Sequence, residues 1–132
     1  MSDERALDLC HDAREENLRP LTSLERAYID RLLTAEFPGR EQIRQQAEAV
    51  LARRIDPEGS LQLAPRAEVP ADVLARVPVE GEAVDVDGMP IYFLLHVVDG
   101  QLSELEIYKA DSSSILRMPP PDAIQVSSPP FS

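Results

Sequence analysis

Hydrophobic residues recur with a helical period in the first part of the chain. Over residues 22–36 they lie three or four positions apart on one face, and charged residues fill the other positions. Thr22 followed by Glu25 has the sequence of a capping box, which predicts where this helix begins. A second periodic stretch follows a Pro-Gly break and predicts a helix over residues 40–54. The short link between the two stretches predicts an antiparallel helical hairpin.

The pattern changes to strand-like runs further along the chain. Residues 83–109 contain three apolar runs separated by Asp87-Gly88 and Asp99-Gly100, and Asp-Gly between such runs is a strong hairpin signal. Alternation over Ser60–Ala64 predicts another short strand, and the proline-rich residues 65–81 suit a connector. We therefore predict an α+β fold, with the N-terminal helical hairpin packed on one face of a four- to five-stranded antiparallel β-meander.

The hydrophobic pattern also predicts how the strands of the meander pair. A two-residue type I′ turn at Asp87-Gly88 brings Val86 opposite Met89. A two-residue second turn would place Glu104 and Glu106 on the core face, which is costly, so a three-residue turn with a bulge at Gly100 is predicted instead. The predicted core face then consists of Val84, Val86, Ile91, Phe93, Leu95, Val97, Leu105 and Ile107.

The opposite face of the meander is the candidate functional surface. In the predicted register Tyr92 pairs with Glu106, Leu94 pairs with Glu104, and Phe93 faces Leu105 on the core side. Carboxylates around tyrosines and a leucine suit a basic partner, because the charges steer association and the apolar groups anchor the complex. The predicted partner-binding residues are Asp85, Tyr92, Leu94, His96, Glu104, Glu106 and Tyr108.

Charge narrows the classes of partner. The formal net charge is −11, and residues 56–132 carry −9 of it, whereas residues 19–55 carry +2. Binding to nucleic acid phosphates or to an anionic membrane needs a basic surface, so neither is expected. A basic protein partner is compatible with this charge, and its identity and the oligomeric state of the chain are left open.

The remaining composition indicates a setting and a division of the chain. A single cysteine, Cys10, excludes an internal disulfide and suits a reducing cytoplasm, and no apolar run is long enough to span a membrane. All basic residues except Lys109 are arginine, which suggests a GC-rich bacterial source. We predict an acidic, loosely ordered or helical segment over 1–18, one domain over 19–126 and a disordered tail over 127–132.

No motif in the sequence specifies a reaction. Asp85 and Asp87 are interpreted as turn residues rather than a metal motif, and His96 near Glu104 lacks a nucleophile beside it. We therefore expect a non-enzymatic protein with no catalytic residues, no metal site and no cofactor. The alternative is a small ligand-binding domain or enzyme whose pocket lies between the helices and the sheet, near Tyr28 and Phe93.

A resemblance covers residues 18–126. Arg19-Pro20-Leu21-Thr22 with Glu25, Asp56 with Gly59-Ser60-Leu61, and the stretch DVDGMPIYFLLHVVDGQLSELEIYKAD resemble a family of short bacterial proteins of unknown function. The segment LSELEIY is also loosely similar to small proteins of the toxin-immunity type. The first resemblance implies no known activity, and the second implies that the partner is a basic toxin.

Overall fold

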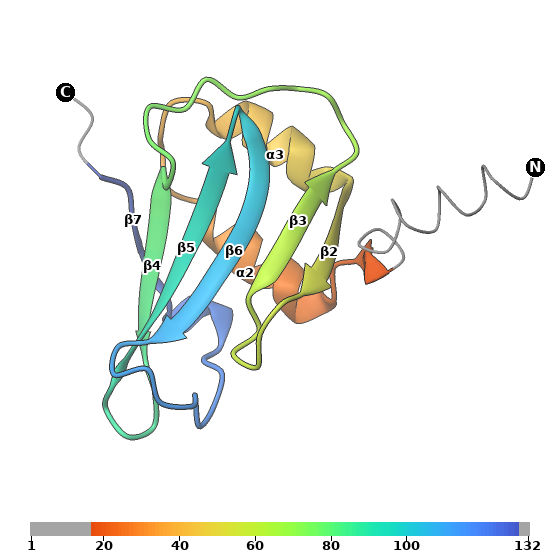
Figure 1. The fold of residues 1–132 in the computed structure, drawn as a ribbon. Coiled ribbons are helices and arrows are strands. Elements are labelled where there is room, and N and C mark those ends of the chain that lie inside the picture. The colour runs from red at the N-terminus through yellow and green to blue at the C-terminus, as the bar shows by residue number, and fades with distance from the viewer. Residues whose placement is uncertain (1–16, 130–132) are drawn as a thin grey trace, which may run out of the picture.

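A seven-stranded antiparallel sheet makes up most of the structure, a computed structural model that describes residues 17–129 (Figure 1). The strands lie in the order β1-β2-β3-β6-β5-β4-β7. Two short helices pack on one side of this sheet and appear behind it in Figure 1. In chain order the elements are β1 (Arg19–Pro20), α2 (Ser23–Leu32), α3 (Arg40–Glu48), β2 (Val50–Arg54), β3 (Leu61–Pro65), β4 (Val79–Val84), β5 (Pro90–Val98), β6 (Gln101–Lys109), η2 (Pro121–Ala123) and β7 (Gln125–Ser127).

The start of α2 is where the sequence predicts it. The hydroxyl of Thr22 accepts the backbone N–H of Glu25 at 3.1 Å, and the carboxylate of Glu25 accepts the N–H of Thr22 at 2.9 Å. This capping box satisfies two of the N–H groups that a helix end leaves without partners. Tyr28, Ile29 and Leu32 then point into the core.

The predicted fold of a helical hairpin on a four- to five-stranded meander is wrong, because the chain leaves the second helix early. α3 ends at Glu48, and Val50–Arg54 is strand β2, which pairs with β3. A period of two fits the start of this segment as well as a helical period does, because Val50 and Ala52 are buried whereas Leu51 and Arg53 are only partly buried. Two unpredicted strands, β1 and β2, therefore extend the sheet on the side of β3.

The turn between β4 and β5 is one residue longer than predicted. Ala83 pairs with Ile91 and Val84 pairs with Pro90, so that Val86, Asp87 and Gly88 form a three-residue loop. Gly88 has a φ of 86°, in the left-handed region that glycine adopts without strain. As a consequence Val84 and Val86 are exposed, and Asp85 points into the protein.

The turn between β5 and β6 is one residue shorter than predicted. Asp99 and Gly100 form a two-residue turn with φ values of 52° and 77°, which fits type I′. The extra residue lies beyond the turn, at Ser103, because His96 pairs with Glu104 whereas Val97 pairs with Leu102.

The two corrections change the strand pairs but keep most of the predicted core. The predicted opposition of Phe93 and Leu105 is wrong, since Phe93 pairs with Ile107 and Leu95 pairs with Leu105. All four of these residues are buried, and so are Ile91 and Val97. The bulge at Ser103 thus does what the predicted bulged turn was meant to do, which is to keep the glutamates of β6 out of the core.

The predicted segments at the two chain ends are only partly described. Of the predicted loose segment, residues 1–16 lie outside the described residues. Of the predicted tail, Ser127 belongs to β7 and residues 130–132 lie outside the described residues. β7 pairs with β4 and forms one edge of the sheet.

Candidate functional site

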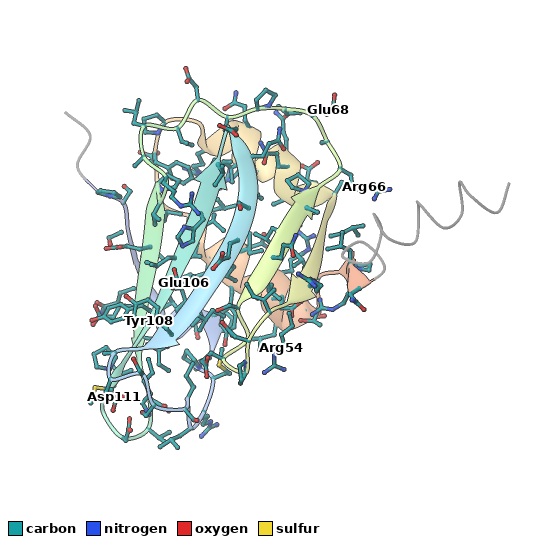
Figure 2. All side chains as sticks on the ribbon, viewed as in Figure 1. Arg54, Arg66, Glu68, Glu106, Tyr108 and Asp111 are labelled. Carbon is teal, nitrogen blue, oxygen red and sulfur yellow. The ribbon has the colours of Figure 1, made fainter. Side chains whose placement is uncertain are left out.

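The strands β4, β5 and β6 expose one side of the sheet away from the helices. Directly paired residues of neighbouring strands point to the same side, so the cross-strand pairs identify its members. No helix or strand in the described part of the chain lies over this side, on which Figure 2 labels Glu106 and Tyr108. We call it the open face, and it consists of Glu80, Glu82, Val84, Tyr92, Leu94, His96, Glu104, Glu106 and Tyr108.

Six of the seven predicted partner-binding residues meet on the open face, although their neighbours differ from the prediction. Tyr92 pairs with Tyr108 rather than with Glu106, and Leu94 pairs with Glu106 rather than with Glu104. Glu104 instead lies opposite His96. Asp85 is the exception, because the longer β4–β5 turn points its side chain to the inside of the protein.

An aromatic and apolar group occupies one end of the open face. The rings of Tyr92 and Tyr108 lie with their centroids 5.2 Å apart and are inclined by 38°. Tyr108 is 38% exposed, and Val84 on the neighbouring β4 is 60% exposed. Burial, together with the nearby Glu106 carboxylate, raises the pKa of the Tyr108 phenol, so its hydroxyl stays protonated and can donate a hydrogen bond. These side chains offer an amphipathic anchor of the kind found at protein interfaces.

Four glutamates surround this group. Among the residues that the structure describes, no Arg or Lys side chain forms an ion pair with Glu80, Glu82, Glu104 or Glu106. The open face therefore carries negative charge that no Arg or Lys ion pair within the described residues neutralises.

Glu80 and Glu82 are functional candidates that the sequence reasoning missed. Glu80 lies in residues 65–81, which were predicted to be a connector because of their prolines, and Glu82 lies directly after them. The sequence of β4 nevertheless alternates, and Val79, Gly81 and Ala83 are buried while the two glutamates are exposed. That alternation was the available signal.

His96 is held between an arginine and a carboxylate. Its Nε2 lies 2.8 Å from an oxygen of Glu106, and Arg76 donates from Nε to its Nδ1 at 3.2 Å. Because Nδ1 accepts a hydrogen bond from Arg76, the ring proton is assigned to Nε2, from which it can be donated to Glu106. His96, Glu104 and Glu106 could together hold a metal ion, since one ligand atom of each lies within 4.8 Å of the others.

Asp85 belongs to a buried ion cluster at the end of the sheet. Its carboxylate lies 2.9 Å from the ammonium group of Lys109 and accepts the backbone N–H groups of Val86, Leu116 and Arg117. Burial alone would raise the pKa of Asp85, but Lys109 and these N–H groups hold that pKa well below its usual range. With its acceptor sites occupied by the protein itself, Asp85 lies inside the protein and not on the open face.

A cavity of about 390 Å³ lies beside Tyr28 at the start of α2. Its walls include Leu24, Leu105, Ile115 and Met118, so much of the lining is apolar. Its lining includes residues from α2 and from β6, next to Tyr28, where the alternative prediction placed a pocket. Phe93 is not part of the lining, and its ring packs against that of Tyr28 with the centroids 4.9 Å apart.

Most of the polar side chains around this cavity already have partners. The hydroxyl of Tyr28 donates to the carbonyl of Pro119 at 2.6 Å, and Glu25 accepts two hydrogen bonds from Arg19. Arg54 donates to the carbonyls of Asp56 and Pro57. The cavity therefore presents few free polar groups with which to orient a substrate.

A family model matches residues 18–119, which include α2, α3 and the whole open face. The chain belongs to the family described as domain of unknown function DUF6984. This membership agrees with the predicted resemblance to proteins of unknown function, and it supplies no activity. No curated protein and no solved structure matches the chain. In the described part of the chain, neither helix combines the length and the apolar composition that crossing a bilayer requires.

Proposed function

We propose that this protein is a non-enzymatic binding module that docks a basic protein partner on its open face. The observation that supports this most is the combination of an aromatic pair and four glutamates without an Arg or Lys partner among the described residues, on a sheet side that no described helix or strand covers. A basic surface would be attracted by the glutamates and anchored by Tyr92, Tyr108 and Val84.

A more specific form of the proposal names the cellular compartment and the type of partner. In it the protein acts in the bacterial cytoplasm, and the partner is a basic toxin that an immunity-type protein occludes. The loose similarity of the segment LSELEIY is what suggests this form. It is tested by asking whether the captured partner is toxic to cells when the protein is absent.

Charge reversal on the open face tests the docking surface. The natural partner is captured by cross-linking in the source cells, and its affinity is then measured with purified proteins. We expect Glu104→Lys with Glu106→Lys to weaken binding by about a hundredfold, because charges that attract the partner then repel it. Added salt is expected to weaken binding to the unmodified protein as well, because salt screens exposed charges.

A matched control separates the location of the charge from its amount. Glu48→Lys with Glu68→Lys changes the net charge equally, but both residues are exposed and lie outside the open face. This control is expected to retain most of the affinity. The proposal is wrong if the two double variants bind the captured partner equally well while both keep the unfolding midpoint of the unmodified protein.

The cavity beside Tyr28 supports a second candidate, a small apolar ligand. Its volume lies within the range of known ligand sites. Ile115→Trp would fill part of this space without touching the open face. If apolar ligands found by a thermal-shift screen stabilise the unmodified protein but not this variant, the cavity is a ligand-binding site.

A further inference from the structure

Three metal-binding side chains converge on the open face from two strands. His96 comes from β5, and its direct partner Glu104 and the neighbouring Glu106 come from β6. The bulge at Ser103 is what brings them together, because without it Glu104 would lie opposite Leu95 and point into the core. The imidazole is mostly covered, with 14% of its side chain exposed, whereas 38% of the Glu106 side chain is exposed.

We propose that His96, Glu104 and Glu106 bind a divalent transition-metal ion of the zinc type. One imidazole and two carboxylates are a donor set that zinc accepts, and three protein ligands leave a position open on the solvent side. This inference does not rest on the proposed partner, because it concerns the metal alone.

The geometry requires a small rearrangement of the cluster. Ligand atoms about 2.1 Å from a tetrahedral zinc ion lie about 3.4 Å from each other. The three candidate atoms already lie within 4.8 Å, and the His96–Glu106 contact is 2.8 Å. Rotation of the two glutamate side chains, neither of them buried, supplies the remaining movement.

The hydrogen bond from Arg76 to His96 competes with metal binding. Its Nε–H donates to Nδ1 of His96, so the imidazole proton lies on Nε2, the nitrogen next to Glu106. A metal ion on Nε2 requires the proton to move to Nδ1, where it would face the N–H of Arg76. Arg76 is exposed and can turn away, so metal binding and the Arg76 contact exclude each other.

The surrounding charge favours a cation. Glu80 and Glu82 lie on the same side of the neighbouring strand β4 and form no ion pair in the described part of the chain. Their field raises the local concentration of cations without contributing a ligand atom to the cluster. An experiment can therefore distinguish two effects: coordination of the ion by His96, Glu104 and Glu106, and general attraction of the ion by the charge of the open face.

Zinc alone is the probe, and the full chain is used with Cys10→Ser and His11→Gln. These changes remove the only thiol and the other imidazole of the sequence, so that His96 gives the only imidazole signals in the NMR spectrum. Calorimetry measures the zinc affinity, and the ring nitrogen shifts of His96 report its tautomer. We expect zinc to move the proton from Nε2 to Nδ1, and His96→Gln, Glu104→Gln or Glu106→Gln to weaken binding by about tenfold or more.

Two comparisons make the test specific. Arg76→Gln is expected to tighten zinc binding, because it removes the competing donor. Glu80→Gln removes the same charge as Glu106→Gln from the same face, and it is expected to weaken binding far less. The proposal is overturned if His96→Gln binds zinc as tightly as its parent, if Glu80→Gln and Glu106→Gln weaken binding equally, or if magnesium at the same concentration displaces the zinc.

Discussion

The ammonium group of Lys109 lies 2.9 Å from the carboxylate of Asp85, and both side chains are almost completely buried. Lys109 also donates to Asp87 at 2.8 Å and to the carbonyl of Ser114 at 3.3 Å. Its three N–H groups therefore each have an acceptor, which the burial of a charged group requires. The cluster joins the end of β6, the β4–β5 turn and the loop that follows β6.

Removing one member of this cluster is expected to destabilise the fold to an extent that follows burial. Asp85→Asn leaves the Lys109 charge short of its most buried partner, whereas Asp87→Asn affects a carboxylate whose side chain is 39% exposed. We therefore expect a larger fall in the urea midpoint for Asp85→Asn than for Asp87→Asn, and Lys109→Met to resemble Asp85→Asn. An equal or larger fall for Asp87→Asn would contradict this assignment.

The same cluster predicts how stability changes with pH. Burial would raise the pKa of Asp85, but Lys109 and the backbone N–H groups lower this pKa on folding. Asp85 therefore stabilises the folded state fully only above the ordinary pKa of aspartate, about 4. The pKa of Lys109 is raised by Asp87 and Asp85, so its contribution exists below about 10.4.

We therefore expect the cluster to stabilise the fold fully between about pH 4 and about pH 10.4. Its contribution should fall as the pH drops below 4 and as it rises above 10.4. Unfolding midpoints across this range test the prediction against Asp85→Asn, which should flatten the acid side. If the unfolding midpoint of Asp85→Asn falls with decreasing pH as steeply as that of the unmodified protein, other carboxylates cause the acid destabilisation.

Features set by neighbouring residues were predictable from the sequence, and features set by distant contacts were not. The capping box of α2 depends on residues three apart, and the buried alternation of β5 depends on its own side chains. The lengths of the two turns were interchanged. The extra residue that keeps the glutamates of β6 out of the core was placed in the turn at Gly100, whereas it lies in the strand at Ser103. The contact between Asp85, directly after β4, and Lys109, at the end of β6, favours the longer first turn.

The same reasoning applies to β2 and to the open face. Val50–Arg54 fits a helical and an alternating pattern, and pairing with β3 selects the strand. Six of the seven candidate residues were placed on the correct side, because the parity of β5 and β6 is fixed by their buried residues. The glutamates of β4 were missed because prolines before it suggested a loop.

Gln46 is expected to be essential for stability, because this polar side chain lies on the buried side of α3 beside Ile43 and Ala47. It is completely buried, donates to the carbonyls of Val69 and Gly100, and accepts the N–H of Leu102. Gln46→Leu leaves these backbone groups short of partners and should cost about 3 kcal/mol in the free energy of unfolding. The exposed neighbour provides the control, since Gln45→Leu should change it by less than about 0.5 kcal/mol. Similar values for the two variants in urea unfolding would contradict the prediction.

Charge removal on the open face is expected to stabilise the isolated chain. Glu80 and Glu106 flank Leu94 from the two neighbouring strands, and like charges about 10 Å apart repel by about 0.4 kcal/mol in water. Glu80→Gln with Glu82→Gln should therefore raise the midpoint of thermal unfolding by a few degrees at low salt, whereas Glu48→Gln with Glu68→Gln should change it less. High salt should remove most of the gain, because it screens the repulsion. If the open-face variant is less stable at low salt, these glutamates support the fold. If it is more stable and also loses the captured partner, the sheet retains unfavourable charge for the sake of binding.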